Sequence, residues 1–246
     1  MSLDTRPLII AHRGASKEAP ENTLAAFALA LELGCTGIEL DVHVSADGAL
    51  IVCHDAEVDR TTDGSGKIAE MTVAELKRLD AGRWFDVRYA GERLPLLEEV
   101  LDLVPPSVPL NIEIKSSLHP DVNRLLLSLL RERNRLNSVF VSSFDFDVLF
   151  ALQRLEPAMR IGLLYDAEAP DYRRLASERG VRLYSLHAHH SWIVPAYVEE
   201  AKRAGLAVYP WTIDAPDRMR EALAAGVSGI ISNDVRLLKE AVESLG

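Results

Sequence analysis

The feature that most constrains the fold is a regular alternation of short apolar runs with helical patterns along nearly the whole chain. Segments such as VNRLLLSLLRER and VPAYVEEAKRAG carry apolar residues at helical spacing. Between such segments lie runs with the length and composition of buried strands: residues 8–11, 37–42, 110–115, 139–144, 160–165, 181–187, 206–212 and 229–233. Strand–helix alternation with nearly continuous apolar strands is typical of a parallel sheet covered by helices.

The number of strands indicates the type of sheet. A ninth apolar run, ALIVCH at 49–54, follows SADG with no room for a crossover helix, so we expect it to return antiparallel as a hairpin from 37–42. Eight strands remain, and seven have a plausible helix after them. They predict an α/β fold, a (β/α)₈ TIM barrel, whose usual size this chain of 246 residues matches. A doubly wound open sheet is the alternative, but it would need about two fewer strands and a Gly-rich turn after the first.

We expect residues 1–246 to form a single barrel domain. Residues from about 56 to 95 are too many for an ordinary loop between barrel elements. They contain a short helix pattern, MTVAELKRLD, among Gly, Asp and Arg residues. We therefore predict a small insertion, after the hairpin of the second strand, that folds over one end of the barrel.

Charge and apolar content exclude several classes of protein. A net charge of -10 argues against a general affinity for nucleic acid or anionic lipid, since both require a basic face. The N-terminus has no signal-peptide pattern, and no apolar run is long enough to span a bilayer. We expect a cytoplasmic protein without stable membrane association. Cys35 and Cys53 are expected to be small buried hydrophobes, because their spacing matches no metal motif or disulfide framework.

Acidic residues stand where the barrel pattern requires apolar ones. Glu39 and Asp41 are two residues apart on one strand, and so are Glu113 and Lys115 on another, so each pair shares a side. Three carboxylates that converge at the carboxyl ends of barrel strands are costly to bury unless a cation neutralises them. Outward-facing carboxylates paired with the covering helices are the alternative. The repeated spacing favours a metal site, and oxygen ligands favour Mg²⁺ or Ca²⁺ over zinc.

Two histidines and two cations stand near the same strand ends. His12 ends the first strand and His54 ends the hairpin arm, so together they can form an acid–base pair that works near neutral pH. Arg13 and Lys115 can contact phosphate oxygens, although Lys115 can instead simply pair with Glu113. A metal, two cations and an acid–base pair are typical of phosphoryl chemistry.

Other residues near these ends leave alternatives open. Asp55 can either orient His54 or begin a turn. Ser142 and Ser143 lie at a strand end, but no nucleophile elbow surrounds them, so acyl transfer is not indicated.

The motifs AHRGASKEAPENT, GIELDVHVSADGALIVCHD, NIEIK, VSSF, PWTID and GVSGIISND, in this order, resemble the glycerophosphodiester phosphodiesterase family over nearly the whole chain. The resemblance implies a (β/α)₈ barrel that hydrolyses glycerophosphodiesters to glycerol 3-phosphate and an alcohol. It also implies functional residues: metal ligands Glu39, Asp41 and Glu113, the acid–base pair His12 and His54, and the phosphate-contacting Arg13 and Lys115. Which histidine is the base stays open, as does direct attack by water against prior attack by a neighbouring hydroxyl.

Further positions follow from the same resemblance. Trp211 in the WT motif is expected either to form an aromatic wall for the glycerol or to be a core residue, and His187 to reach the substrate from its strand end. Two residues depart from the commoner family pattern: Asp214 stands where Asn is frequent, and Asn233 where Thr is frequent. Both put the leaving-group preference in question. Apart from the resemblance, Asn22 or Thr23 is placed to cap the first helix, and Asn22 is also expected to fix the loop after Arg13.

Three functions remain to be separated. The leading one is hydrolysis of small glycerophosphodiesters such as glycerophosphocholine or glycerophosphoethanolamine. A lysophospholipase D activity is the alternative within the family, with Trp84, Phe85 and Tyr89 of the insertion against the acyl chain. A non-catalytic binding protein on the same barrel is the third. The intact histidine pair and carboxylates argue against it.

Overall fold

The computed structural model describes residues 6–116 and 118–245 of the chain. Eight strands are parallel and follow the expected runs: β1 (Leu8–His12), β2 (Gly37–Val44), β4 (Leu110–Ile114), β5 (Val139–Ser143), β6 (Ile161–Tyr165), β7 (Leu183–Ala188), β8 (Ala207–Val208) and β9 (Gly229–Ser232). The antiparallel β3 (Leu50–Val52) pairs with β2, which confirms the hairpin.

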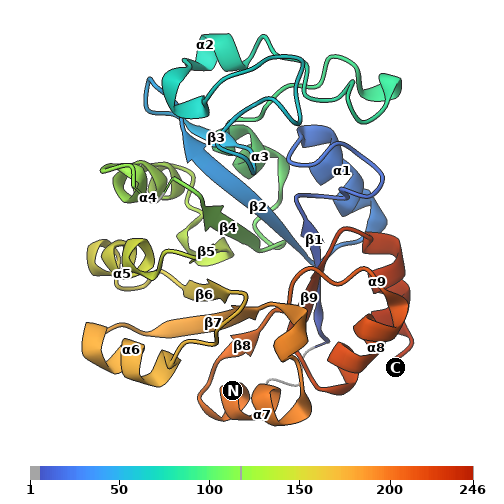
Figure 1. The fold of residues 1–246 in the computed structure, drawn as a ribbon, viewed down its shortest axis with the longest axis vertical. Coiled ribbons are helices and arrows are strands. Elements are labelled where there is room, and N and C mark those ends of the chain that lie inside the picture. The colour runs from blue at the N-terminus through green and yellow to red at the C-terminus, as the bar shows by residue number, and fades with distance from the viewer. Residues whose placement is uncertain (1–5, 117, 246) are drawn as a thin grey trace.

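The eight parallel strands form a nearly closed barrel. Their ladder runs in the order β8-β7-β6-β5-β4-β2-β1-β9. The first and last strands of this ladder are joined by backbone hydrogen bonds, from Ser228 N to Val208 O at 3.0 Å and from Ile231 N to Pro210 O at 3.0 Å. In Figure 1 the strands lie at the centre of the molecule and the helices lie around them. The predicted TIM barrel is therefore confirmed.

Helices cover the outside of the barrel. Helix α2 (Val73–Leu76) belongs to the long segment between β3 and α3. The covering helices are α1 (Leu24–Leu33), α3 (Leu97–Leu103), α4 (Val122–Glu132), α5 (Phe146–Leu155), α6 (Tyr172–Arg179), α7 (Pro195–Arg203), α8 (Pro216–Ala224) and α9 (Val235–Glu243). The largest apolar cluster lies between these helices and the outer face of the strands. Among the described residues, no helix is both long and apolar enough to cross a membrane.

Alternation along the strands separates the two faces of the barrel wall. On β2, Ile38, Leu40 and Val42 belong to the outer apolar cluster, whereas Glu39 and Asp41 have their side chains on the opposite face. Inside the barrel a second cluster is built from Ile10, Phe140, Ala207, Tyr209 and Ile231. Two residues further along their strands stand His12, Ser142 and Asn233. The interior is thus apolar at its floor and polar at the carboxyl ends, where a barrel carries its site.

The segment between β3 and α3 is longer than the other connections. It contains the 3₁₀ turns η1 (Ile68–Glu70) and η2 (Val87–Tyr89) as well as α2, and it lies at the top of Figure 1. It has a small apolar cluster of its own, made of Ile51, Cys53, Val58, Ile68, Leu76, Ala81 and Leu94. The boundaries of this insertion, and its separation from the barrel domain, stay a prediction.

Candidate active site

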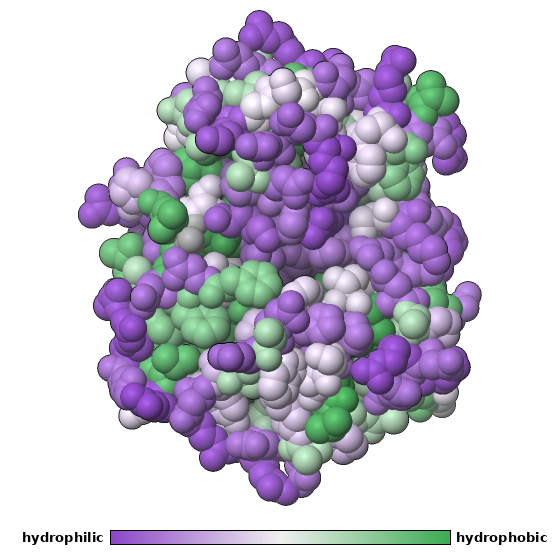
Figure 2. Space-filling view, in the orientation of Figure 1, coloured by the Kyte–Doolittle hydropathy of each residue, from purple (hydrophilic) through white to green (hydrophobic). Residues whose placement is uncertain are grey.

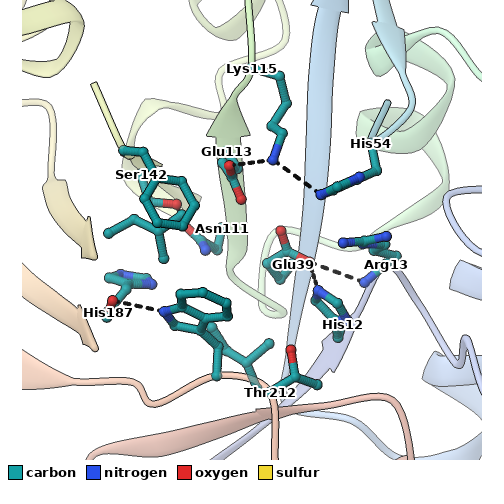
Figure 3. A pocket seen from close by; sticks show the side chains of 14 residues that line it. His12, Arg13, Glu39, His54, Asn111, Glu113, Lys115, Ser142, His187 and Thr212 are labelled. Atoms are coloured by element: carbon teal, nitrogen blue, oxygen red, sulfur yellow. Dashed lines mark hydrogen bonds and ion pairs between the residues drawn. The ribbon is translucent and has the colours of Figure 1, made fainter. Parts of the chain in front are cut away.

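The first site residues are set by a sharp turn after β1. Arg13 and Gly14 both have positive φ angles, 55° and 83°. A Cβ atom at Gly14 would lie 2.6 Å from the backbone carbon of Ala26, so only glycine fits. Arg13 is held in its left-handed conformation by the hydrogen bond from its N–H to Glu39 O at 2.9 Å. The turn directs the Arg13 side chain beside Glu39 and His12 (Figure 3).

The three predicted carboxylates meet. Glu39, Asp41 and Glu113 are buried, and one oxygen of each lies within 4.8 Å of the others. Burial, and then the neighbouring Asp41 and Glu113, raise the pKa of Glu39 well above its ordinary value. Burial and the charge of Asp41 also raise the pKa of Glu113. Asp41 Oδ1 is buried without a hydrogen-bond partner. An unpaired oxygen within a cluster of like charges fits a bound divalent cation.

Of the two residues expected to cap the first helix, only Thr23 does so, while Asn22 donates its N–H to Arg13 O at 2.9 Å. Thr23 is the N-cap of α1, because its side chain accepts from Ala26 N, and Asn22 lies before the helix with a φ of 56°. Asn22 instead donates from Nδ2 to Asp41 Oδ2 at 2.9 Å. It therefore supports one oxygen of the carboxylate cluster and leaves the other oxygen of Asp41 free.

Two cations face the three carboxylates. Arg13 places Nε 3.3 Å from Asp41 Oδ2. Lys115 Nζ donates to Glu113 Oε1 at 2.7 Å and lies 3.7 Å from Asp41 Oδ1. Burial alone would lower the pKa of Lys115, but Glu113 and Asp41 outweigh it and raise this pKa. The cluster still carries one negative charge more than these two cations balance, and a divalent cation would reverse that excess.

His54 is fixed from three directions. Its Nδ1 lies 2.6 Å from Asp55 Oδ1, and its Nε2 lies 3.2 Å from Lys115 Nζ (Figure 3). Its backbone oxygen lies 3.0 Å from Nε2 of His43, a buried histidine whose Nδ1 lies 3.1 Å from Ser116 Oγ. Asp55 thus orients His54, one of the two possibilities that the sequence left open. His43 was not singled out, because a lone histidine in an apolar strand carries no local signal.

Arg60 joins the two halves of the site. It donates from Nε to Asp55 Oδ2 at 2.6 Å, and from Nη1 and Nη2 to the carboxylate of Glu21 at 2.9 and 2.8 Å. Glu21 in turn accepts from Arg13 Nη1 at 2.7 Å. Both Arg60 and Glu21 were missed by the sequence analysis. Their contacts are long-range, and nothing in the local sequence distinguishes Arg60 from other arginines of the segment.

His12 lies opposite His54 in the site. Its Nδ1 is 2.7 Å from Asn233 Oδ1, and its Nε2 is 3.9 Å from Glu39 Oε2. Burial, and then the charge of Arg13, lower the pKa of His12 to about 4. Both effects favour the neutral form of the ring.

These side chains surround one cleft. In Figure 2 the face shown is hollowed near its centre, and the hollow is mostly hydrophilic with more hydrophobic surface beside it. The predicted residues that line the cleft are His12, Arg13, Glu39, His54, Glu113, Lys115, His187 and Trp211. Asp41 lies next to this lining, with one oxygen within 4.8 Å of an oxygen from each of the other two carboxylates.

One wall of the cleft is aromatic. Trp211 donates from Nε1 to His187 O at 2.9 Å, and its ring lies edge to face with Phe144 at 5.7 Å. Phe144 is 49% exposed and was not predicted. His187 is fully buried, with Nε2 2.9 Å from Ser185 Oγ, and burial lowers its pKa to about 3. Trp211 and His187 thus line the cleft as a neutral wall opposite the charged groups.

The fold and this arrangement define the class of barrel hydrolases that act on phosphoric diesters. Residues 12–237 match the model of the glycerophosphoryl diester phosphodiesterase family. A glycerophosphodiester phosphodiesterase of Caldanaerobacter subterraneus subsp. tengcongensis is 42% identical over 98% of this chain and 100% of its own length. The chain therefore belongs to the glycerophosphoryl diester phosphodiesterase family.

Solved structures agree with this assignment. A phosphodiesterase of Oleispira antarctica, in complex with the product sn-glycerol-3-phosphate, matches with a TM-score of 0.90 and 31% identity, over 96% of this chain and 97% of that one. A glycerophosphodiester phosphodiesterase of Agrobacterium tumefaciens matches with a TM-score of 0.84 and 31% identity, over 95% and 99% of the two chains.

Proposed function

We propose that this protein hydrolyses small glycerophosphodiesters to glycerol 3-phosphate and an alcohol, with a divalent metal ion held by Glu39, Asp41 and Glu113. The observation that carries the proposal is the meeting of these buried carboxylates with two histidines and two cations around one cleft. The product named for the Oleispira antarctica structure supports the choice of substrate. When bound, Mg²⁺ or Ca²⁺ would offset negative charge on the phosphoryl oxygens.

The chain's own residues supply the other parts of the reaction. Arg13 and Lys115 bind the non-bridging phosphate oxygens. His12 takes a proton at Nε2 from the attacking hydroxyl, whether this belongs to water or to the glycerol. His54 Nε2 faces the ammonium of Lys115, so it becomes free to carry a proton once Lys115 turns to a phosphate oxygen. It then gives this proton to the oxygen of the leaving alcohol, while Asp55 holds the ring at Nδ1. In each displacement one P–O bond forms and one breaks, His12 takes up a proton and His54 releases one. If water attacks, a single displacement gives glycerol 3-phosphate. If the glycerol hydroxyl attacks, the first product is a cyclic phosphodiester, which water opens in a second displacement with the two histidine roles reversed.

The uncharged side of the cleft suits the glycerol part of a small substrate. Trp211 and Phe144 present ring faces and edges against which the glycerol can lie. A second candidate, cleavage of lysophospholipids, is favoured by exposed apolar side chains in the segment between β3 and α3. Trp84 there is 41% exposed and Val87 is 73% exposed. The cytoplasmic location stays a prediction.

A substrate panel tests the proposal. EDTA-treated protein is incubated with glycerophosphocholine, glycerophosphoethanolamine or lysophosphatidylcholine, before and after addition of Mg²⁺ or Ca²⁺. We expect metal-dependent release of glycerol 3-phosphate from the first two compounds. His12→Ala and His54→Ala are each expected to lose at least about a hundredfold in turnover, the usual scale for an acid–base group. Trp84→Ala is the control for the lipid alternative and leaves turnover of glycerophosphocholine unchanged.

Two outcomes would overturn the proposal. If neither Mg²⁺ nor Ca²⁺ leads to release of glycerol 3-phosphate, glycerophosphocholine and glycerophosphoethanolamine are excluded as substrates. Cleavage of lysophosphatidylcholine alone, lost in Trp84→Ala, would instead establish the lipid activity.

A further inference from the structure

Asp214 and Asn233 are hydrogen-bonded to each other. They are the two positions at which the sequence departs from the commoner family pattern. Asp214 Oδ1 accepts from Asn233 N at 2.8 Å and from Ser232 Oγ at 2.9 Å. Its other oxygen, Oδ2, accepts from Asn233 Nδ2 at 2.6 Å. Three hydrogen bonds therefore hold the carboxylate of Asp214, although it lies at the exposed rim of the barrel.

These bonds determine which way the amide of Asn233 points. An ionised carboxylate only accepts hydrogen bonds, so the side of Asn233 that faces Asp214 must be its NH₂ group. The amide oxygen then faces the opposite way, 2.7 Å from His12 Nδ1 and 2.8 Å from Ser16 Oγ. An amide oxygen also only accepts, so His12 must carry its proton on Nδ1.

Ser16 does not determine which way the Asn233 amide points. A hydroxyl both donates and accepts, and its hydrogen rotates to suit its neighbour. Ser16 therefore follows the orientation of Asn233, while the acceptor-only carboxylate of Asp214 sets it.

We propose that Asp214 and Asn233 are positioning residues that keep His12 in the tautomer with its proton on Nδ1 and its electron pair on Nε2, on the side of the carboxylates. In a neutral histidine the hydrogen bond made by one ring nitrogen decides which nitrogen is protonated. His12 Nε2 lies 3.9 Å from Glu39 Oε2, and His12 lines the cleft. The tautomer of His12 does not depend on the proposed function. Only the use of Nε2 as a base rests on the proposed function.

Removing the charge of Asp214 should reverse the order of donors. In Asp214→Asn the new Oδ1 keeps accepting from Asn233 N, so the new NH₂ group faces the NH₂ group of Asn233. Two donors cannot bond, so the Asn233 amide turns over and presents its NH₂ group to His12. Nδ1 of His12 must then accept, and its proton moves to Nε2. The base in the proposed reaction loses its free electron pair.

An exchange of the two residues should restore the original order. In the double variant Asp214→Asn with Asn233→Asp, the carboxylate at position 233 accepts on one side from the new amide and on the other from His12 Nδ1. The proton of His12 thus returns to Nδ1. A purely structural role for either residue does not predict that two changes together cancel the effect of one.

Asp234→Asn is the matched control. Asp234 is next to Asn233 in sequence, accepts from Lys17 Nζ at 2.5 Å, and caps α9 by accepting from Leu237 N at 3.0 Å. Asparagine is also a good N-cap, so this change removes the same charge at the same rim and keeps the helix. Asp234 does not take part in the bonds that link Asp214 to His12.

The test is a long-range ¹H–¹⁵N spectrum of the histidine rings in ¹⁵N-labelled, EDTA-treated protein near pH 7. The His12 signals are assigned by their absence in His12→Gln. We expect protonated Nδ1 in the wild type, in Asp234→Asn and in the exchange variant, and protonated Nε2 in Asp214→Asn. In the metal-supplemented enzyme we expect kcat of Asp214→Asn to fall at least about tenfold, with KM little changed. A tenfold fall in kcat corresponds to the free energy of about one hydrogen bond.

Protonated Nδ1 in folded Asp214→Asn would overturn the inference, and so would the same loss of kcat in Asp234→Asn. Protonated Nε2 in the exchange variant would also overturn it, even if Asp214→Asn failed to fold. The spectra need no substrate. A wild type without turnover therefore counts against the proposed function, while the tautomer is judged from the spectra.

Discussion

Replacement of Arg60 by alanine tests whether the long segment between β3 and α3 supports the site. Arg60 donates to Asp55, the partner of His54, and to Glu21, the partner of Arg13. Its removal leaves both carboxylates without their main cation. We therefore expect Arg60→Ala to be less stable and to turn over substrate more slowly than the wild type, although Arg60 contacts neither the carboxylate cluster nor the neutral wall.

The size of the stability loss follows from Glu21. Burial alone would raise the pKa of Glu21, but hydrogen bonds and charge from Arg60 and Arg13 lower it from 4.5 to about 2. At 1.36 kcal/mol per pKa unit this corresponds to roughly 3 kcal/mol, shared between the two arginines. The side chain of Arg60 is 45% exposed, so solvent screens its part. We expect Arg60→Ala to lower the free energy of unfolding by about 1–2 kcal/mol at pH 7.

The pH dependence has a definite sign. Because the pKa of Glu21 is lower in the folded than in the unfolded protein, its contribution is complete above about pH 4.5 and is lost as the pH falls towards 2. The difference between wild type and Arg60→Ala should therefore narrow below about pH 4.5. Urea denaturation at pH 7 and pH 4, followed by circular dichroism, measures it.

Two variants control the interpretation. Arg88→Ala removes an arginine from the same segment whose hydrogen bond to Asp86 is exposed, with 72% of the Arg88 side chain accessible, and should leave the free energy of unfolding nearly unchanged. Arg60→Lys keeps the charge but lacks the planar fork that reaches two carboxylates, so it should behave more like alanine than like wild type. We expect kcat of Arg60→Ala to fall about tenfold, since Asp55 loses its support. Unchanged kcat and unfolding free energy in Arg60→Ala would refute the reasoning.

Three further predictions concern other parts of the molecule. In EDTA-treated protein, Glu39→Gln should raise the melting temperature by about 2–4 °C, since one of three buried like charges is removed, while calorimetric binding of Mg²⁺ or Ca²⁺ is lost. Stronger metal binding in that variant would contradict the ligand set. Burial raises the pKa of the Cys35 thiol to about 12 and that of Cys53 to about 11, so Ellman's reagent at pH 8 should label them only after unfolding. Gly162→Ala should lower stability and impair catalysis, because its Cβ would lie 2.5 Å from His187 Nε2; a normal melting temperature would show that the cleft wall yields easily.

Much of the barrel is predictable because strand and helix patterns are local. Period-two alternation predicts that Glu39 and Asp41 share one face of β2, and that Glu113 shares a face with Lys115 at the end of β4. Local patterns fail where burial is weak or a backbone donor is absent. Helix α6 has no buried residue, and only the partly buried Tyr172, Leu175 and Ala176 pack against the core, so its apolar pattern is weak. The apolar run at 206–212 gives only the two-residue strand β8, because Pro210 has no N–H for a ladder.

The sequence by itself determined the fold class, the hairpin that returns His54 to the rim, and the residue types of the site, since each depends on spacing along a strand. Only the tertiary structure decided which side chains touch. Asn233 reaches His12 across 221 positions because β9 closes the barrel beside β1, and Arg60 reaches Glu21 across 39 because the long segment folds back over the rim. Such contacts depend on how distant elements pack, and no local pattern encodes that packing.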